Sequence, residues 1–306
     1  MKKLNHLSVT AAILAWIGMG CASQNVDISP VSGGEEPEAI YTTLGGITLG
    51  APRALTVDFT GNIVVADGLP GRIVLWIEST DQSLEFQRPN QQAGFNPSDV
   101  KLYGFFVYGL DPVARNLLRF DNRGAYRDIL IKFDEIVPSQ LITPVGFDVD
   151  RSGRIAVTDT KNHQILLFDS YLALELVFGS YGSAPGQFDT PQGVTFTGDG
   201  GFLVVDSGNR RVQFFDAGGG FTASIPAEGE KNPMVRPRRA VIDTKGNVFV
   251  ADPAAGRVFV YGEDGVLIRT IAPAGVSRFE PADVDVTRMD RVIVVDAANN
   301  SLFVFR

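Results

Sequence analysis

The chain has 306 residues, of which 44% are hydrophobic and 20% charged, and it contains 33 glycines, 17 prolines and one cysteine. A formal net charge of −8 argues against a broadly basic nucleic-acid-binding surface, and the lone cysteine excludes a disulfide framework. The length suits either two domains or one large all-β domain.

The first twenty residues have the pattern of an export signal. Lys2 and Lys3 precede an apolar run from Leu7 to Ile17, which is shorter than the ~18 residues that a membrane-spanning helix needs. Small residues then lead to Cys21, and the segment resembles the lipobox of bacterial lipoproteins, although Gly18 stands where that pattern usually has Leu. We expect a signal peptide over 1–20 and lipid attachment at Cys21. Ordinary signal cleavage after Ala22 is the alternative.

Residues 21–36 are polar and predict a flexible tether. Without residues 1–20 the chain has 25 basic and 35 acidic side chains, a balance of −10, so we expect no nucleic-acid partner. The expected location is the bacterial cell envelope, with membrane contact through the lipid anchor only. Ala22 and Ser23 do not resemble an inner-membrane retention signal, which favours the outer membrane.

The remainder of the chain repeats with a period near 46 residues. Successive copies align on an Asp with spacings of 44, 48, 47, 46 and 44 residues, with a Pro 14 or 15 residues before it and an aromatic nine residues after it. The aligned aspartates are Asp67, Asp111, Asp159, Asp206, Asp252 and Asp296. Such a period indicates a repeat architecture.

Each unit reads as four β-strands. In the copy at 191–216, Val194 and Phe196 alternate with polar residues, the glycine-rich TGDGG predicts a hairpin turn, and FLVV predicts a short strand buried on both faces. Four strands in about 45 residues are typical of a propeller blade.

The two ends predict ring closure. The last unit stops at Arg306, one strand short, whereas residues 38–46 look like an additional fourth strand. We therefore predict one all-β domain over 37–306, a monomeric six-bladed propeller whose last blade is completed by the N-terminal strand.

The units resemble NHL repeats, on the phrases PQGVTFTGDGGFLVVDSGNRRVQFF and PVGFDVDRSGRIAVTDTKNHQILLF. The resemblance implies a six-bladed propeller. It leaves the function open, since the family includes binders of proteins, RNA and small molecules and a few enzymes. The second unit departs most: its first hairpin is one residue shorter, and we expect an irregular blade edge there.

The recurrent Asp is interpreted as structural, because six equivalent positions around a ring do not converge on one substrate. We expect it to accept hydrogen bonds from turn N–H groups or from a basic residue five positions later, such as Arg211. His163 occupies the same turn and is interpreted as a turn residue. No His and Cys cluster predicts zinc, and repeat register argues against a calcium loop at 148–159, so no metal or cofactor is expected.

Function is sought where the copies differ. Two residues after each Pro, small residues are expected because the inner strands crowd the axis, but Asp99, Arg239 and Asp283 depart from this. Together with the nearby arginines they form the candidate binding set: Arg53, Asp99, Arg236, Arg238, Arg239 and Asp283. We expect a surface at the tunnel mouth with a basic side from units 1 and 5 and an acidic side from units 2 and 6. Solvated loop charges are the alternative.

Two functions remain open at this point. The first is a non-catalytic, lipid-anchored module that binds an envelope or extracellular protein, or a small ligand, through the tunnel face. The second is a metal-dependent hydrolase of the lactonase or esterase type, with ligands drawn from Asp99, Asp148, Asp283 and Asp285. Convergence of these carboxylates on one point favours the hydrolase, and pairing with arginines favours the binding module.

Overall fold

Antiparallel strands make up most of the computed structural model, which describes residues 34–87, 94–136 and 141–306. The predicted signal peptide, Cys21 and the tether as far as residue 33 lie outside these residues. The helices described are the 3-10 turn η1 (Glu78–Thr80) and the short α1 (Phe133–Ile136). In these ranges no helix has the length and apolarity to cross a membrane.

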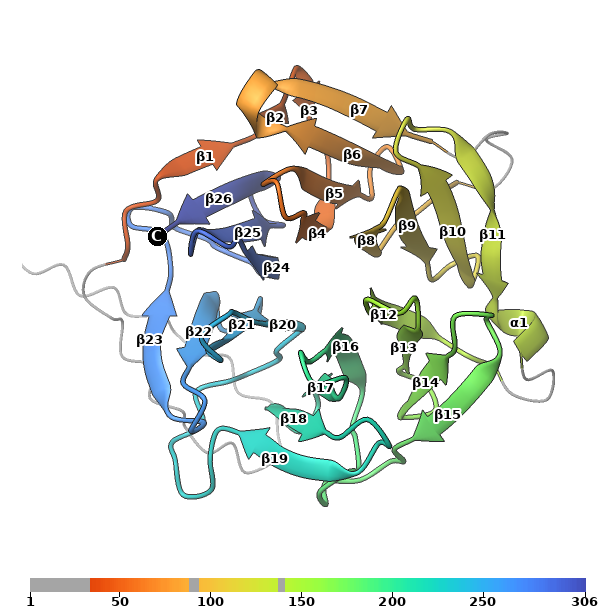
Figure 1. Ribbon diagram of the computed structural model, residues 1–306. Helices are drawn as coiled ribbons and strands as arrows, with labels where there is room; N and C mark the ends of the chain where they lie inside the picture. Colours follow the sequence, from red (N-terminus) through yellow and green to blue (C-terminus); the bar gives the residue numbers. More distant parts are fainter. Residues whose placement is uncertain (1–33, 88–93, 137–140) are drawn as a thin grey trace, which may run out of the picture. The chain divides into compact units, whose positions relative to one another are not determined.

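Six four-stranded sheets surround a central axis, which confirms the predicted all-β six-bladed propeller (Figure 1). The first three blades are β4 (Pro52–Val57), β5 (Ile63–Asp67), β6 (Arg72–Ile77) and β7 (Gln82–Phe86); β8 (Asp99–Tyr103), β9 (Phe106–Asp111), β10 (Asn116–Asp121) and β11 (Tyr126–Lys132); and β12 (Pro144–Val149), β13 (Ile155–Asp159), β14 (Gln164–Phe168) and β15 (Leu174–Phe178).

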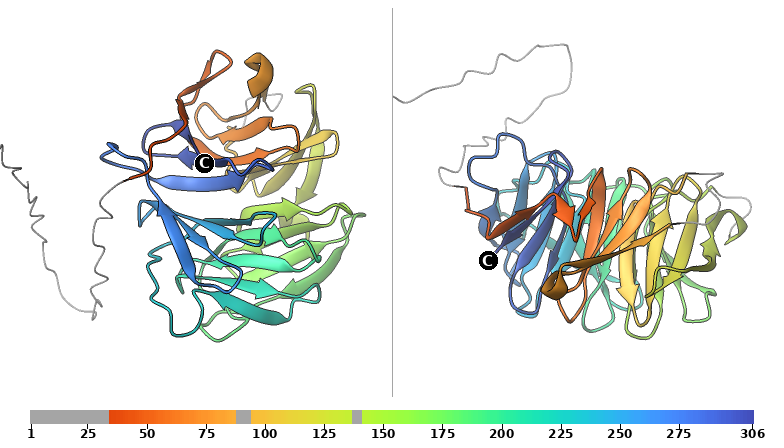
Figure 2. Two further views of the ribbon diagram at one scale, coloured as in Figure 1. Left: turned by 60° about the vertical axis from the view of Figure 1, so that its left-hand side comes forward. Right: turned by 90° about the horizontal axis from the view of Figure 1, so that it is seen from above.

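The other three blades are β16 (Pro191–Phe196), β17 (Phe202–Asp206), β18 (Arg211–Phe215) and β19 (Phe221–Ile225); β20 (Arg239–Ile242), β21 (Val248–Asp252), β22 (Arg257–Tyr261) and β23 (Leu267–Ile271); and β24 (Pro281–Val286), β25 (Val292–Asp296), β26 (Ser301–Phe305) and β1 (Ala39–Tyr41). A small hairpin of β2 (Thr43–Leu44) and β3 (Ile47–Thr48) follows β1. The strands run between two faces on which the turns lie (Figure 2).

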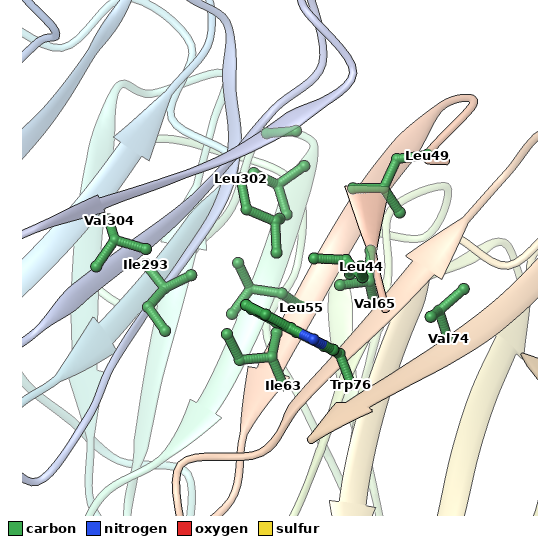
Figure 3. Close-up of a cluster of buried hydrophobic side chains, with 12 residues drawn as sticks. Leu44, Leu49, Leu55, Ile63, Val65, Val74, Trp76, Ile293, Leu302 and Val304 are labelled. Atoms are coloured by element: carbon green, nitrogen blue, oxygen red, sulfur yellow. The ribbon is translucent and has the colours of Figure 1, made fainter. Parts of the chain in front are cut away.

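The second strand of each blade is the most buried, as its continuous apolar sequence predicts. In β17, every residue from Phe202 to Asp206 is buried, whereas the fourth strand β15 alternates between exposed and half-buried positions. The apolar faces of neighbouring blades meet in separate clusters. One cluster joins the first and last blades through Leu55, Trp76 and Leu302 (Figure 3).

The N-terminal strand closes the ring, as predicted. β1 pairs antiparallel with β26, with Ala39 opposite Val304, and the Tyr41 ring lies 4.7 Å from that of Trp76. Arg291 donates to both carboxylate oxygens of Glu78 at 2.7 Å, which ties the last blade to η1 of the first. This bonding holds the pKa of Glu78 below its usual range, against the opposing effect of burial.

Ordered structure begins before the predicted boundary at residue 37. The backbone N–H of Glu35 donates to the Ala272 carbonyl, the Ala274 N–H donates to the Glu35 carbonyl, and the Glu35 carboxylate lies 3.2 Å from Arg269. The prediction of a flexible tether through residue 36 was therefore too long. Glu35 is held by one isolated β-bridge and one ion pair, and neither contact produces a periodic hydrophobic pattern that could be recognised in the sequence.

The second blade is irregular where the sequence predicts it. Its first hairpin turns through Gly104 and Phe105 alone, and β8 and β9 pair without the register shift that follows Pro52 or Pro281 in other blades. The outer pair β10–β11 contains two register shifts. The shorter inner hairpin and the two register shifts of the outer pair make this blade irregular.

The recurrent Asp has the predicted structural role. All six are fully buried, and Asp206, for example, accepts hydrogen bonds from the Asp189 N–H, from Asn209 and from Arg211. Four residues after each Asp the backbone turns left-handed, with φ between 50° and 91°. The residues at this position are Gly71, Arg115, His163, Arg210, Gly256 and Asn300. His163 is confirmed as a turn residue, and its Nδ1 accepts from the Thr190 N–H.

Arg210→Gly is expected to stabilise the fold by up to about 1 kcal/mol, because a non-glycine residue in the left-handed region carries a steric cost that exceeds the entropy lost by glycine. Arg210→Val is expected to destabilise it, since a β-branched side chain fits this region worst. Urea unfolding of the two variants measures both changes. Equal stabilities would contradict the assignment of strain to this turn.

Candidate functional site

The inward-facing residues of the six inner strands form two layers along the tunnel. The alternation of side chains in a strand places every second residue on the axis. The first layer consists of Ala54, Asp99, Gly146, Gly193, Arg239 and Asp283, and the second layer lies two residues further along each strand, at Thr56, Lys101, Asp148, Thr195, Val241 and Asp285. Each layer therefore combines one cation with two aspartates.

In the first layer Arg239 joins two carboxylates from different blades. Its Nη2 donates to Oδ1 of Asp99, and its Nε lies 3.3 Å from Oδ1 of Asp283. All three side chains are at most 5% exposed. The tunnel is thus bridged by a buried ion-paired triad from β8, β20 and β24.

The pKa shifts follow from this burial. Burial alone lowers the pKa of Arg239, but the charges of Asp99 and Asp283 outweigh it and raise the pKa above its usual value. Burial raises the pKa of Asp283 to about 6, although the Arg239 charge opposes the shift. Arg239 is therefore always charged, and its charge favours the ionised form of the buried Asp283 carboxyl.

The same carboxylates serve as backbone acceptors between blades. Asp99 Oδ2 accepts from the Phe147 N–H, and Asp283 Oδ2 accepts from the Leu55 N–H, each at 2.9 Å. In both cases the donor belongs to the inner strand of the next blade, whose inner edge has no partner strand. The acceptor oxygens of the first layer are therefore engaged by main-chain donors as well as by Arg239.

The second layer also combines a cation with carboxylates, but its ion pair is longer. Lys101 Nζ lies 3.7 Å from Asp148, whose other oxygen accepts from the Phe196 N–H. Asp285 accepts from the Val57 N–H, and burial raises its pKa, partly offset by Lys101. Thus none of the four candidate metal-binding carboxylates has both oxygens unengaged.

This donor set does not fit a metal ion. Binding a cation at the first layer would require Arg239 to leave Asp99 and Asp283, and the four carboxylates lie in two layers rather than around one point. Throughout the described ranges no group of three or more His, Cys, Asp or Glu side chains is arranged to hold a metal. The geometry matches the pairing that favours the binding module.

Two glycines make room for Arg239. A Cβ at Gly146 would lie 2.5 Å from the Gln192 carbonyl oxygen and 3.3 Å from Nη1 of Arg239, and a Cβ at Gly193 would lie 3.3 Å from Cδ of Arg239. The small residues of the third and fourth blades therefore make room for the long side chain from the neighbouring fifth blade, so the layer is filled by residues of unequal size.

Above the triad lies the tunnel mouth, the end at which all six inner strands begin. Its cavity has a volume of about 240 Å³ including space open to solvent, and it is lined by Arg53, Ala54, Ser98, Asp99, Val145, Gly146, Gln192, Arg238, Arg239, Ala282 and Asp283. Arg53 and Arg238 are half-buried at the wall. Arg236 is exposed and is not among the lining residues.

The expected acidic side does not exist as a surface feature. Asp99 and Asp283 are buried and paired with Arg239 inside the tunnel, so the prediction of an acidic side was wrong, whereas Arg53 and Arg238 of the expected basic side do line the mouth. The sequence contains an indication of this pairing, because side chains of opposite charge occupy the same register position in different units. Residues at the same register position of the six inner strands lie close together around the axis. Side chains of opposite charge form ion pairs there instead of forming separate acidic and basic regions on the face.

Replacing Arg239 by Met is expected to cost about 3–5 kcal/mol at pH 7, because it leaves two buried carboxylates without their cation. Without the Arg239 charge the pKa of Asp283 rises further, and the folded state takes up protons more readily than the unfolded state. Stability therefore falls as pH rises from 4 to 7, and the deficit relative to wild type shrinks towards pH 4. Unfolding between pH 4 and 7, with Arg236→Met as control, measures this. A pH-independent deficit would contradict the ion-paired triad.

Comparison with known proteins supports the repeat assignment. The sequence model of the NHL repeat matches residues 141–168. Protein brain tumor of Drosophila melanogaster is 28% identical over 138 residues, 44% of this chain and 13% of that protein. Human NHL repeat-containing protein 3 is 34% identical over 83 residues, 26% of this chain and 24% of that protein. The matches span a quarter or less of each relative.

Solved structures share the fold at low sequence identity. A gluconolactonase from Xanthomonas campestris superposes with a TM-score of 0.64 at 14% identity, over 84% of this chain and 85% of that chain. A catalytically inactive virginiamycin B lyase from Staphylococcus aureus gives 0.60 at 14%, over 83% and 94%. A chain of a nidogen/laminin complex gives 0.60 at 18%, over 72% and 80%. The matched repeat and the six four-stranded sheets together show a six-bladed β-propeller that contains an NHL repeat and is similar in sequence to NHL-repeat proteins.

Proposed function

We propose that this protein is a non-catalytic binding module that presents the tunnel-mouth face to a protein partner. The observation that carries the proposal is the internal pairing of the tunnel charges. Asp99 and Asp283 are bonded to Arg239 and to backbone N–H groups, so neither is free to act as a base or as a metal ligand. The hydrolase alternative needs such free carboxylates.

The composition of the face supports a protein partner. The turns between second and third strands lie on the tunnel-mouth face, because the second strand returns to the end at which the first began. Here Leu69 and Val113 are exposed, Tyr181 is exposed in the loop leading to β16, and Arg236 is exposed beside the cavity. Aromatic and arginine side chains are enriched at protein interfaces. A structurally similar chain comes from a complex of two proteins, nidogen and laminin.

We also propose that the propeller is attached to the cell envelope through an acyl chain on Cys21. The export-type segment at 1–20 and the single cysteine directly after it support this location. The segment between Cys21 and Glu35 then spaces the propeller from the membrane.

The partner proposal is tested by cross-linking the full chain to envelope extracts and comparing two charged variants of matched exposure. Val113→Glu changes a residue that is 72% exposed on the tunnel-mouth face, and Phe59→Glu changes one that is 75% exposed at a hairpin tip on the opposite face. We expect partner recovery to fall at least tenfold with Val113→Glu and to stay unchanged with Phe59→Glu. The reverse pattern would place the interface on the other face, and no reproducible partner would overturn the proposal.

The anchor proposal is tested by metabolic labelling with a fatty acid in a bacterium with two membranes. Wild-type chain is expected to carry the label and to fractionate with membranes, whereas Cys21→Ser is expected to lose both properties. A secreted, unlabelled wild-type chain that begins at Ser23 would show ordinary signal cleavage instead.

A further inference from the structure

Two arginines at the tunnel mouth are left without an acidic partner. Arg53, in β4 of the first blade, and Arg238, directly before β20 of the fifth, both line the cavity. In the part of the chain that the structure describes, no carboxylate oxygen lies within 4.0 Å of either guanidinium group. Arg239, the third arginine that lines the cavity, is paired, so Arg53 and Arg238 are the two lining cations without a carboxylate partner in the described residues.

The arginines are unpaired because the carboxylates of the cavity are already engaged. Asp99 bonds to Arg239 and to the N–H groups of Val100 and Phe147, and Asp283 pairs with Arg239 and accepts from Val284 and Leu55. Turning either carboxylate towards the mouth would leave a buried backbone donor without an acceptor, which is destabilising. Arg53 is also confined, since a Cβ at Gly68 would lie 2.5 Å from its Nε.

The charges around the cavity leave one positive charge unbalanced. Three arginines and two aspartates line it. Burial lowers the pKa of Arg238; Asp283 and Asp99 oppose this shift, and the charges of Arg239 and Arg53 add to it. A single negative charge placed between the two free guanidinium groups would relieve this repulsion in a partly desolvated site.

The size of the cavity limits what enters it. The cavity measures about 240 Å³ even with the space open to solvent included, which is below the roughly 300–1,000 Å³ of small-molecule pockets. A complete organic ligand does not fit, but the end group of a larger molecule does. A carboxylate carries one negative charge, and its two oxygens match the fork of a guanidinium group in geometry.

We propose that Arg53 and Arg238 form a receptor for one carboxylate group at the tunnel mouth. The proposal rests on the proposed function, and it assigns the carboxylate to the protein partner, as an acidic side chain or a C-terminus. A phosphate group, with a charge near −2, would overcompensate the single unbalanced charge.

The receptor is tested without any partner, by titrating the arginine Nε–Hε resonances of the full chain with sodium acetate at constant ionic strength. We expect two resonances to shift with saturation, and we expect them to be absent from spectra of Arg53→Gln and Arg238→Gln respectively. Each variant is expected to weaken acetate binding at least tenfold. Arg236→Gln, from the same basic run but outside the cavity, is expected to bind acetate as wild type does.

Matched titrations distinguish the ligand classes. Chloride is expected to cause no saturable shift, and inorganic phosphate is expected to bind more weakly than acetate. Tighter binding of phosphate would overturn the carboxylate assignment, and wild-type affinity in Arg238→Gln would overturn the site. An acetylated peptide with one Asp and an amidated C-terminus, compared with its free-acid form lacking Asp, separates a side chain from a C-terminus as the source.

The outcomes stay separate from those of the partner experiment. Saturable acetate binding with no partner recovered would leave the receptor and remove the proposed function. If Val113→Glu loses a partner that the wild-type chain recovers, and the wild-type chain does not bind acetate, the proposed function is supported and the carboxylate receptor is overturned.

Discussion

The inner edges of the blades impose the constraint on which the tunnel depends. Six first strands converge on the axis, and the inner edge of each has no neighbouring strand to accept its N–H groups. Because buried donors need acceptors, side chains of adjacent blades supply them: Asp283 accepts from Leu55 and Asp99 accepts from Phe147. Buried carboxylates in turn need a cation, and Arg239 supplies it. The need of these backbone N–H groups for acceptors thus explains why charged residues occupy positions at which crowding alone predicts small residues.

This order of causes bears on function. Residues that look catalytic because they are charged, central and non-repeating are engaged in holding the ring together. The groups that remain free are at the margin of the cavity, where Arg53 and Arg238 face no carboxylate in the described chain. The architecture shared with a gluconolactonase and a lyase therefore does not bring their activities with it, since the fold fixes the positions of inward residues and not their chemistry.

The fold could be predicted from the sequence almost completely, because a repeat multiplies weak local signals. Pro, Asp and aromatic spacings fix each blade, and the unpaired segment at 38–46 indicates the closure by β1. The sequence singles out the candidate residues, but their arrangement could not be derived from it. Asp99 and Arg239 are 140 residues apart in the sequence, and Arg239 and Asp283 are 44 residues apart. The geometry of the blades determines which register positions face one another across the axis. The early contact of Glu35 with the fifth blade likewise left no periodic signal.

The pairing of β1 with β26 also sets the order of events in biogenesis. Ala39 is among the first residues of the propeller to be made and its partner Val304 among the last, so the ring stays open until the final strand of the last blade has been made. The first and last blades then gain their contact with each other in one late step, and this contact has the largest sequence separation among the strand pairs. Removing a few residues from β1 or from β26 opens the same seam.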